Sequence, residues 1–178
     1  MDILYPLMSI PVVKFFGLST LSYRFLMVLL SIVSMFTLYN ALMKSSNHSK
    51  LNLLFIIALY LNPWMIMANR WALESNFFPI VMIFALSAFL MFENNNVHKL
   101  AWFILFTMCV ALSAYSYSNN WMFLAIFVPA IFVFLLIKKK INLKFFVLGI
   151  IEILAIVWPL LLFVYVNYIG DIHFMFWG

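Results

Sequence analysis

The residues best suited to chemistry lie between positions 62 and 76, in the stretch NPWMIMANRWALESN. Arg70 and Glu74 are four residues apart, so on a helix they share one face and can pair. Trp71 and Asn76 lie beside them. Charged residues at membrane depth are costly and tend to be functional. The alternative is a surface ion pair flanked by an interfacial aromatic belt, and the spacing alone does not favour either interpretation.

Tyr115 and Tyr117 form a second candidate, in the segment AYSYS at the end of an apolar stretch. Alternating aromatic and hydroxyl side chains are typical of the aromatic belt at a membrane surface, and they also suit the lining of a sugar pocket. Glu152 lies inside another apolar stretch. A carboxylate there indicates a functional residue or a glutamate that is protonated or hydrogen-bonded to a neighbouring helix, and we favour the second interpretation.

Metal ligands and reactive thiols are sparse in the sequence. Asp171 and His173 are two residues apart near the C-terminal end, but two ligands do not make a metal site. We therefore predict no metal site and no cofactor in this chain. Cys109 is the single cysteine and lies in an apolar stretch, so we expect it to pack as a small hydrophobic residue.

The composition is that of an integral membrane protein. Of the 178 residues, 68% are hydrophobic and only 8% are charged, whereas soluble domains carry about 25% charged residues. The net charge of +5 therefore bears on membrane orientation, and we predict no nucleic-acid partner. The long apolar stretches predict an all-α fold, because a helix satisfies every backbone polar group within lipid.

The apolar stretches predict a polytopic helical bundle with about six transmembrane helices, in one transmembrane domain over residues 1–178. A span needs about 20 apolar residues. Residues 2–18 contain two prolines and Lys14, so we predict an interfacial segment that ends at Gly17. The six predicted spans are residues 21–43, 51–67, 77–92, 100–117, 121–137 and 145–168.

The lysines and arginines divide unequally between the two sides of this predicted bundle. One side carries seven of the ten, and the other carries Lys14, Arg24 and Arg70. Because cytoplasmic loops are enriched in Lys and Arg, the side with seven is predicted to be cytoplasmic. The chain is then a multi-pass protein of the cell membrane, with its unusual polar residues on the extracytoplasmic face. The seven residues are Lys44, Lys50, Lys99, Lys138, Lys139, Lys140 and Lys144.

The order of these features resembles membrane glycosyltransferases of the GT-C class, which include protein O-mannosyltransferases and aminoarabinose transferases. The chain looks most like the large bacterial membrane proteins of that class from Gram-positive organisms. Four stretches carry the resemblance and together span nearly the whole chain: LYPLMSIPVVKFFGLSTLSYRFLMVLL, NPWMIMANRWALESNFFP, ALSAYSYSNNWMFLAIFVP and WPLLLFVYVNYIGDIHF. Family stretches often have a histidine after the Pro-Trp pair, where this chain has Met65.

The resemblance implies a function. Such enzymes transfer a sugar from a polyprenyl-phosphate carrier to an acceptor on the extracytoplasmic face, within the lipid membrane. Arg70 and Arg24 would contact the phosphate at headgroup level, because arginine suits phosphate binding. Glu74 would hold Arg70 in place. The remaining substrate-binding residues implied are Trp71, Asn76, Tyr115 and Tyr117.

The resemblance also implies that part of the enzyme is missing. The family's acidic residue lies in a first outer loop, and Asp2 does not match it. We expect the chain to be part of a larger GT-C-type domain, lacking the first helix, the acidic first outer loop and the C-terminal part. It is then inactive alone, and a divalent cation would belong to the full-length enzyme. Two alternatives stay open: a lipid flippase or transporter that uses Glu152, and a non-catalytic membrane subunit.

Overall fold

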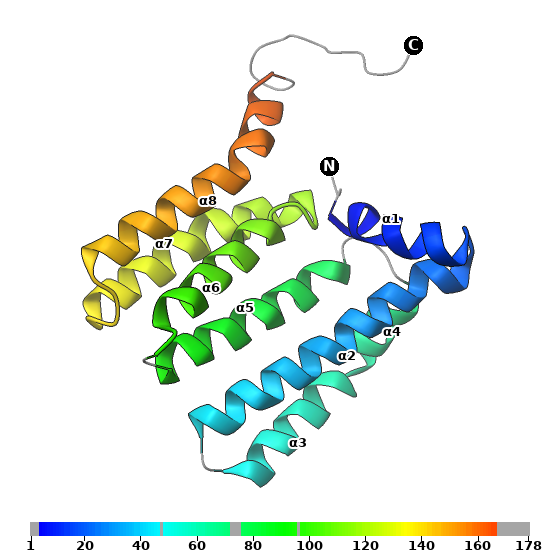
Figure 1. The fold of residues 1–178 in the computed structure, drawn as a ribbon, viewed down its shortest axis with the longest axis horizontal. Helices are drawn as coiled ribbons and strands as arrows, with labels where there is room; N and C mark the ends of the chain where they lie inside the picture. Colours follow the sequence, from blue (N-terminus) through cyan, green and yellow to red (C-terminus); the bar gives the residue numbers. More distant parts are fainter. Residues whose placement is uncertain (1–3, 47, 72–75, 96, 167–178) are drawn as a thin grey trace.

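The computed structural model describes residues 4–46, 48–71, 76–95 and 97–166, and these residues form helices and no strand. The predicted all-α class is confirmed (Figure 1). The helices are α1 (Leu4–Phe16), α2 (Thr20–Ser45), α3 (Ser49–Tyr60), α4 (Pro63–Trp71), α5 (Phe77–Asn94), α6 (Lys99–Ser113), the short 3-10 helix η2 (Ser118–Asn120), α7 (Trp121–Ile137) and α8 (Leu143–Val164).

Fewer helices than predicted are long enough to cross a membrane. Among the described residues, α2, α5 and α8 are sufficiently long and apolar, and the bent pair α3–α4 makes a fourth span if it crosses as one. Each predicted span corresponds to a helix or to this pair. However, α6 has 15 residues and α7 has 17. At 1.5 Å per residue they are about 22 and 26 Å long, whereas the hydrocarbon core is about 30 Å thick.

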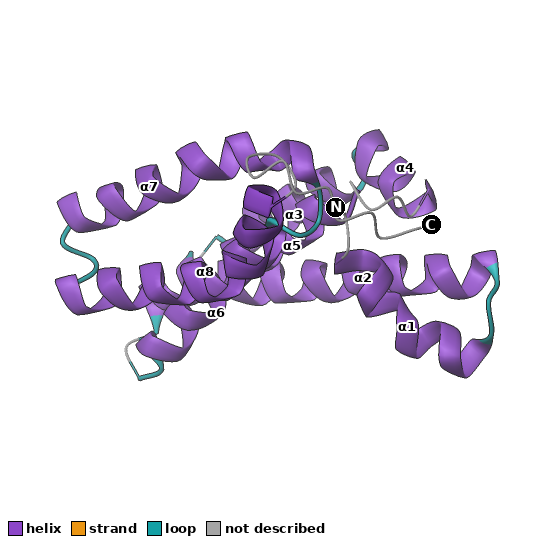
Figure 2. Ribbon diagram, turned by 90° about the horizontal axis from the view of Figure 1, so that it is seen from above, coloured by secondary structure: helices purple, strands orange, loops and turns teal. Residues whose placement is uncertain are grey.

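The N-terminal segment forms the short helix α1, which ends where the sequence predicts. Gly17 has a φ of +78°, a left-handed conformation that commonly ends helices and that glycine adopts without strain. Two residues later, Ser19 caps the start of α2, where its Oγ accepts a hydrogen bond from the backbone N–H of Ser22 at 3.1 Å. The chain therefore changes direction at Gly17, and α1 lies at one end of the bundle (Figures 1 and 2).

The predicted second span is broken at Asn62 and Pro63. Proline disfavours the helical conformation of the residue before it, and it is well tolerated at the first position of a new helix. The Asn62 side chain accepts a hydrogen bond from the backbone N–H of Trp64 at 2.9 Å and so caps α4. As a result, α3 and α4 meet at an angle of 53°.

Helix α5 is the centre of the bundle, with extensive contacts to α2 on one side and α6 on the other (Figure 1). Small side chains at Ala85 and Ala88 allow the close approach, and both are about 1% exposed. Beyond α6 lies α8, and α7 runs along the outside with few contacts to α8 (Figure 2). The packing is therefore tightest in the α2–α5–α6 layer and loosest at α7 and α8.

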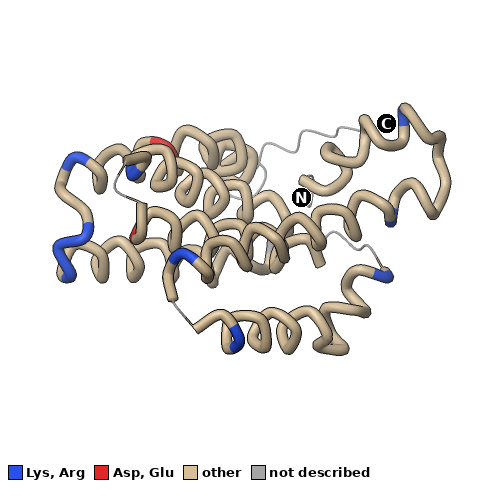
Figure 3. The backbone as a smooth tube through the Cα atoms, turned by 60° about the horizontal axis from the view of Figure 1, so that its bottom comes forward, with Lys and Arg blue, Asp and Glu red and all other residues tan. Residues whose placement is uncertain are grey.

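The two ends of the bundle differ in charge (Figure 3). We call one the basic end: it holds the connections α2–α3, α5–α6 and α7–α8 and the seven lysines that the sequence places together. An ion pair between Lys140 and Glu93 links the α7–α8 connection to the end of α5. The opposite end, here the α1 end, holds α1, the start of α2 and the turn that follows α6. A hydrogen bond from Leu4 N to Tyr115 O, 3.2 Å long, joins α1 to that turn.

Candidate functional site

Three cations lie at or toward the α1 end. Lys14 is in the last turn of α1, Arg24 is one turn into α2, and Arg70 is in the last turn of α4. All three side chains are exposed. None of them forms an ion pair with a carboxylate in the described part of the chain. Their charges are therefore available to an anion that approaches this end.

The structure places Arg70 deeper along the bundle than Arg24. Helix α3 runs antiparallel to α2, with Asn52 Nδ2 donating to Leu42 O at 3.2 Å and the Tyr60 hydroxyl contacting Ser34 Oγ at 2.7 Å. From Asn52 to Tyr60 the contact moves eight residues along α3, and it moves eight residues in the opposite direction along α2, from Leu42 to Ser34. After the 53° bend the helices diverge from this register. From Tyr60 to Asn69 the chain advances nine residues, but its contact on α2 moves only three residues, from Ser34 to Ser31.

Arg70 follows Asn69, whose Nδ2 donates to Ser31 Oγ at 3.0 Å. Ser31 is seven residues beyond Arg24 on α2, which corresponds to about 10 Å along the helix. The two arginines thus lie at different positions along α2. That both lie at headgroup level remains a prediction. An anion bound by both side chains would lie between these two positions, because a long arginine side chain can bridge part of the separation.

A polar network that sequence reasoning missed holds α4 in this position. It consists of Ser31, Ser34, Tyr60 and Asn69, and it lies between α2 and the bent pair. Asn69 Oδ1 is buried and has no hydrogen-bond partner among the described residues. Unpaired polar groups are costly in lipid, so this network favours one arrangement of α4 and thereby positions the adjacent Arg70.

The sequence contains a signal for this network. Polar residues recur every three positions in α2, in the segment SIVSMFTLYN. Three residues turn a helix by about 300°, which is about 60° short of a full turn, so each polar residue lies about 60° around the helix from the one before it. Ser31 and Asn40 therefore lie on opposite faces. Ser31 and Ser34 contact the bent pair, whereas Thr37 and Asn40 line a cavity beside α5 and α6.

The three other residues predicted around Arg70 have different surroundings. Trp71 is 57% exposed at the end of α4, as expected for a side chain at a membrane surface. Asn76 donates from Nδ2 to Ala68 O at 3.3 Å, so its amide satisfies a carbonyl at the end of α4. Glu74 lies outside the described residues, and the predicted pairing with Arg70 remains a prediction.

Tyr115 joins the turn after α6 to α8. Its hydroxyl donates to Ile156 O at 2.6 Å. Pro159 lies three residues beyond Ile156, and a proline inside a helix disturbs the carbonyls of the preceding turn, so Tyr115 supplies a donor where the helix ladder is weak. The Tyr117 hydroxyl accepts a hydrogen bond from Asn119 Nδ2 at 3.0 Å. The Tyr115 hydroxyl is thus used as a donor within the fold, while the Tyr117 hydroxyl donates to no acceptor among the described residues.

Tyr5 fixes α1 against the bundle. Its ring packs edge-on against Tyr23 at 4.8 Å and against Phe77 at 5.5 Å between ring centroids. Its hydroxyl donates to the backbone carbonyl of Tyr23. Burial, and then the neighbouring Tyr23, raise the pKa of Tyr5 to about 12. The phenol therefore stays neutral at physiological pH and acts as a structural donor.

Glu152 is hydrogen-bonded to a neighbouring helix, which is the interpretation favoured from sequence. The Thr107 hydroxyl on α6 donates to Glu152 Oε2 on α8 at 2.5 Å. Cys109 is buried, as expected for a packed hydrophobic residue. Asp171 and His173 lie outside the described residues, and the described part of the chain holds no cluster of three or more metal-ligating side chains.

Compared with protein-family models, curated proteins and solved structures, the chain matches none of them. Arguments about function therefore depend on the residues and on the geometry of the α1 end.

Proposed function

We propose that this chain is part of a membrane glycosyltransferase and binds the phosphate of a polyprenyl-phosphate sugar donor at the α1 end. The observation that supports this most is the set of exposed cations Lys14, Arg24 and Arg70, which have no carboxylate partner in the described chain. A phosphate anchored in a membrane needs cationic donors near the surface, and a guanidinium offers two parallel hydrogen bonds to it.

The proposal includes six membrane crossings, with the α1 end extracytoplasmic and the basic end cytoplasmic. The seven lysines at the basic end support this orientation by the positive-inside rule. Helices α6 and α7 are shorter than a typical span, so the bilayer beside them would thin locally, at a cost of fractions of a kcal/mol per Å of mismatch.

In this proposal the chain's own residues bind and orient the donor. Arg70 and Arg24 contact the phosphate from two depths, and Glu74 orients the Arg70 guanidinium. Trp71 packs against the isoprenoid chain at the membrane surface. Glycosyl transfer also needs a carboxylate that accepts the acceptor's proton, and we propose that this base belongs to the acidic first outer loop of the larger domain.

The decisive experiment measures the binding of a polyprenyl phosphate to the purified chain and to its folded Arg70 variants. Arg70→Lys keeps the charge but loses the paired hydrogen bonds, so we expect binding about ten- to a hundredfold weaker, the effect of one lost charge-assisted bond. Lys144→Ala, at the basic end, is the matched control and should bind like the parent. If Arg70→Lys and Arg70→Ala both bind like the parent, Arg70 has only a structural role.

The orientation has a separate test. Single cysteines at Asn95 and Asn119, in a Cys109→Ala background, report the basic end and the α1 end respectively. A membrane-impermeant thiol reagent added outside intact cells should label position 119 and leave position 95 unlabelled. The opposite result would place the proposed phosphate site in the cytoplasm and would exclude an extracytoplasmic sugar transfer.

A further inference from the structure

A cavity that the proposed function does not use lies between α2, α5 and α6. Its volume is about 270 Å³. Each helix contributes one face, because the lining positions are spaced by three, four or seven residues. The lining residues are Thr37 and Asn40 from α2, Phe84, Ser87, Ala88 and Met91 from α5, and Trp102, Leu105 and Cys109 from α6.

The cavity reaches about as far from the basic end as one membrane leaflet is thick. Along α6, Trp102 is three residues from Lys99 and Cys109 is ten residues from it, which places them about 4.5 and 15 Å from the basic end. Half of the hydrocarbon core is also about 15 Å thick. On α2, Asn40 is four residues from Lys44, so it lies at nearly the same level as Trp102. The mouth of the cavity therefore lies just below two lysines.

Hydrogen-bonding groups without partners lie at this mouth. Asn40 is exposed, and its side chain makes no hydrogen bond to a described residue. Trp102 Nε1 is a buried donor with no acceptor in the described chain. Deeper in the cavity, the Ser87 and Thr37 hydroxyls donate to backbone carbonyls of their own helices, Ile83 O at 2.8 Å and Ser34 O at 2.9 Å. Among the described residues of the cavity, the donors without partners are thus concentrated within about one helical turn of Lys44 and Lys99.

We infer that a glycerophospholipid from the leaflet at the basic end inserts one acyl chain into this cavity. Its ester carbonyl accepts hydrogen bonds from Asn40 Nδ2 and, after a small tilt of the ring, from Trp102 Nε1. Its phosphate lies near Lys44 and Lys99, and its methylene groups contact Phe84, Leu105 and Met91. An acyl chain would fill the apolar part of the cavity without burying a polar group there, and an ester oxygen would accept the hydrogen bonds of the donors at its mouth. The inference is independent of the proposed sugar-donor site at the opposite end.

The test compares two probes with the same headgroup and chains, a diester phospholipid and its diether analogue, which lacks the ester carbonyls. Binding to the folded chain in detergent is measured by native mass spectrometry. We expect the parent to bind the diester about three- to tenfold more tightly, which is the effect of one net hydrogen bond. Equal binding of the two probes would overturn the inference, and this comparison does not depend on any variant.

Variants then locate the site. Asn40→Leu and Trp102→Phe remove one donor each while keeping the side chain's bulk, and each should lower the preference for the diester. The matched controls are Asn94→Leu, an exposed asparagine at the same end, and Trp158→Phe, an exposed tryptophan on α8. These controls should keep the full preference. If the controls lose it as much as the cavity variants do, the lipid binds elsewhere and the inference is wrong.

Discussion

Helices α5 and α8 are both apolar enough to span a membrane, yet they are used in opposite ways. Within the most apolar window of each helix, 50% of the residues of α5 are buried and only 11% of those of α8. Of the two, α8 has the higher mean hydropathy. In a soluble protein the more apolar helix would be the more buried one. In a membrane, lipid replaces water as the solvent, so strong hydropathy suits the helix that faces lipid.

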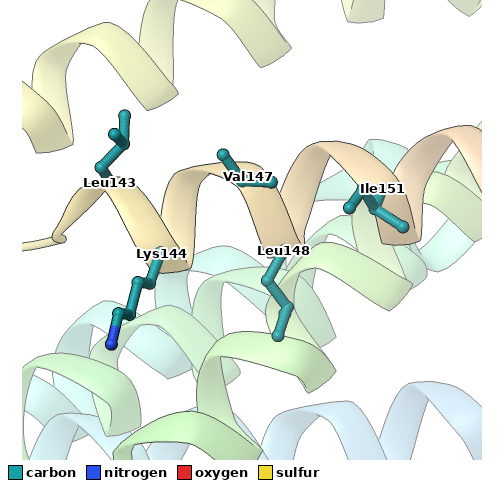
Figure 4. Close-up of a pocket in the computed structure, with 5 residues that line it drawn as sticks. All are labelled: Leu143, Lys144, Val147, Leu148 and Ile151. Atoms are coloured by element: carbon teal, nitrogen blue, oxygen red, sulfur yellow. The ribbon is translucent and has the colours of Figure 1, made fainter.

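The side chains explain the contrast. Helix α5 has small residues, Ala85, Ser87 and Ala88, which let α2 and α6 approach its backbone. Helix α8 has mostly large aliphatic side chains, and a shallow hollow of about 540 Å³ lies open along it. Figure 4 shows that the residues lining this hollow all come from α8, with Leu143 pointing toward α7 and Leu148 pointing the other way. At Gly149, however, α8 approaches its neighbours closely.

The largest expected effect comes from enlarging a small residue of α5. Ala85 is about 1% exposed, so Ala85→Phe overpacks the central layer, and we expect a loss of about 3 kcal/mol in the free energy of unfolding. The matched change on α8 is Leu154→Phe, at a position 50% exposed, which should alter stability by less than about 0.5 kcal/mol. Unfolding in mixed micelles measures both. Equal losses would show that α8 is as closely packed as α5.

Gly149→Ala tests a close approach of α8 to its neighbours. A Cβ atom there would lie 2.7 Å from Phe132 Cζ and 3.0 Å from Phe103 Cζ, and Phe132 is only 2% exposed. Overpacking costs about 1–3 kcal/mol and the gain in helix propensity is about 1 kcal/mol, so we expect a net loss of up to about 2 kcal/mol. Phe132→Leu should reduce that loss when combined with it. A double-mutant cycle measures this coupling, and additive effects would contradict the contact.

Thr107→Val removes the hydrogen bond between α6 and Glu152 of α8. Hydrogen bonds between helices in membrane proteins contribute about 0.6 kcal/mol on average, so we expect a loss of that order. Glu152→Gln keeps an acceptor and should cost less. The same unfolding measurement applies. A loss above about 2 kcal/mol for Thr107→Val would mean that α8 depends on polar contacts more than its lipid-facing surface indicates.

The smallest effect is expected at the ion pair of Lys140 with Glu93, which links the end of α5 to the connection before α8. Both partners are partly exposed, so Glu93→Gln should cost no more than about 0.5 kcal/mol. Raising the salt concentration should reduce even this difference, because salt screens exposed charges. The measurement is the change in unfolding free energy at low and high salt. A larger, salt-insensitive loss would show that this contact holds α8 in place.

The sequence by itself determined the helical class and the division of charge between the two ends. Both follow from local properties: apolar stretches that alternate with polar loops, and lysines gathered in the loops of one side. The end of α1 at Gly17 was also predicted, whereas the break of the span 51–67 at Asn62–Pro63 was not. Helix lengths were less predictable, because hydropathy does not show where a helix ends. The predicted span 100–117 continues through Tyr115, whereas α6 ends at Ser113 and the chain then turns.

Only the tertiary structure decided which polar residues are already bonded within the fold. Tyr115 and Asn76 look equally suited to a substrate in the sequence, yet their donors satisfy Ile156 O and Ala68 O. It also decided the position of Arg70 along α2, because the bend at Pro63 sets how far α4 advances along that helix. Hydrogen bonds between helices and bend angles depend on contacts between residues far apart in the chain, and the pattern of a single sequence does not contain them.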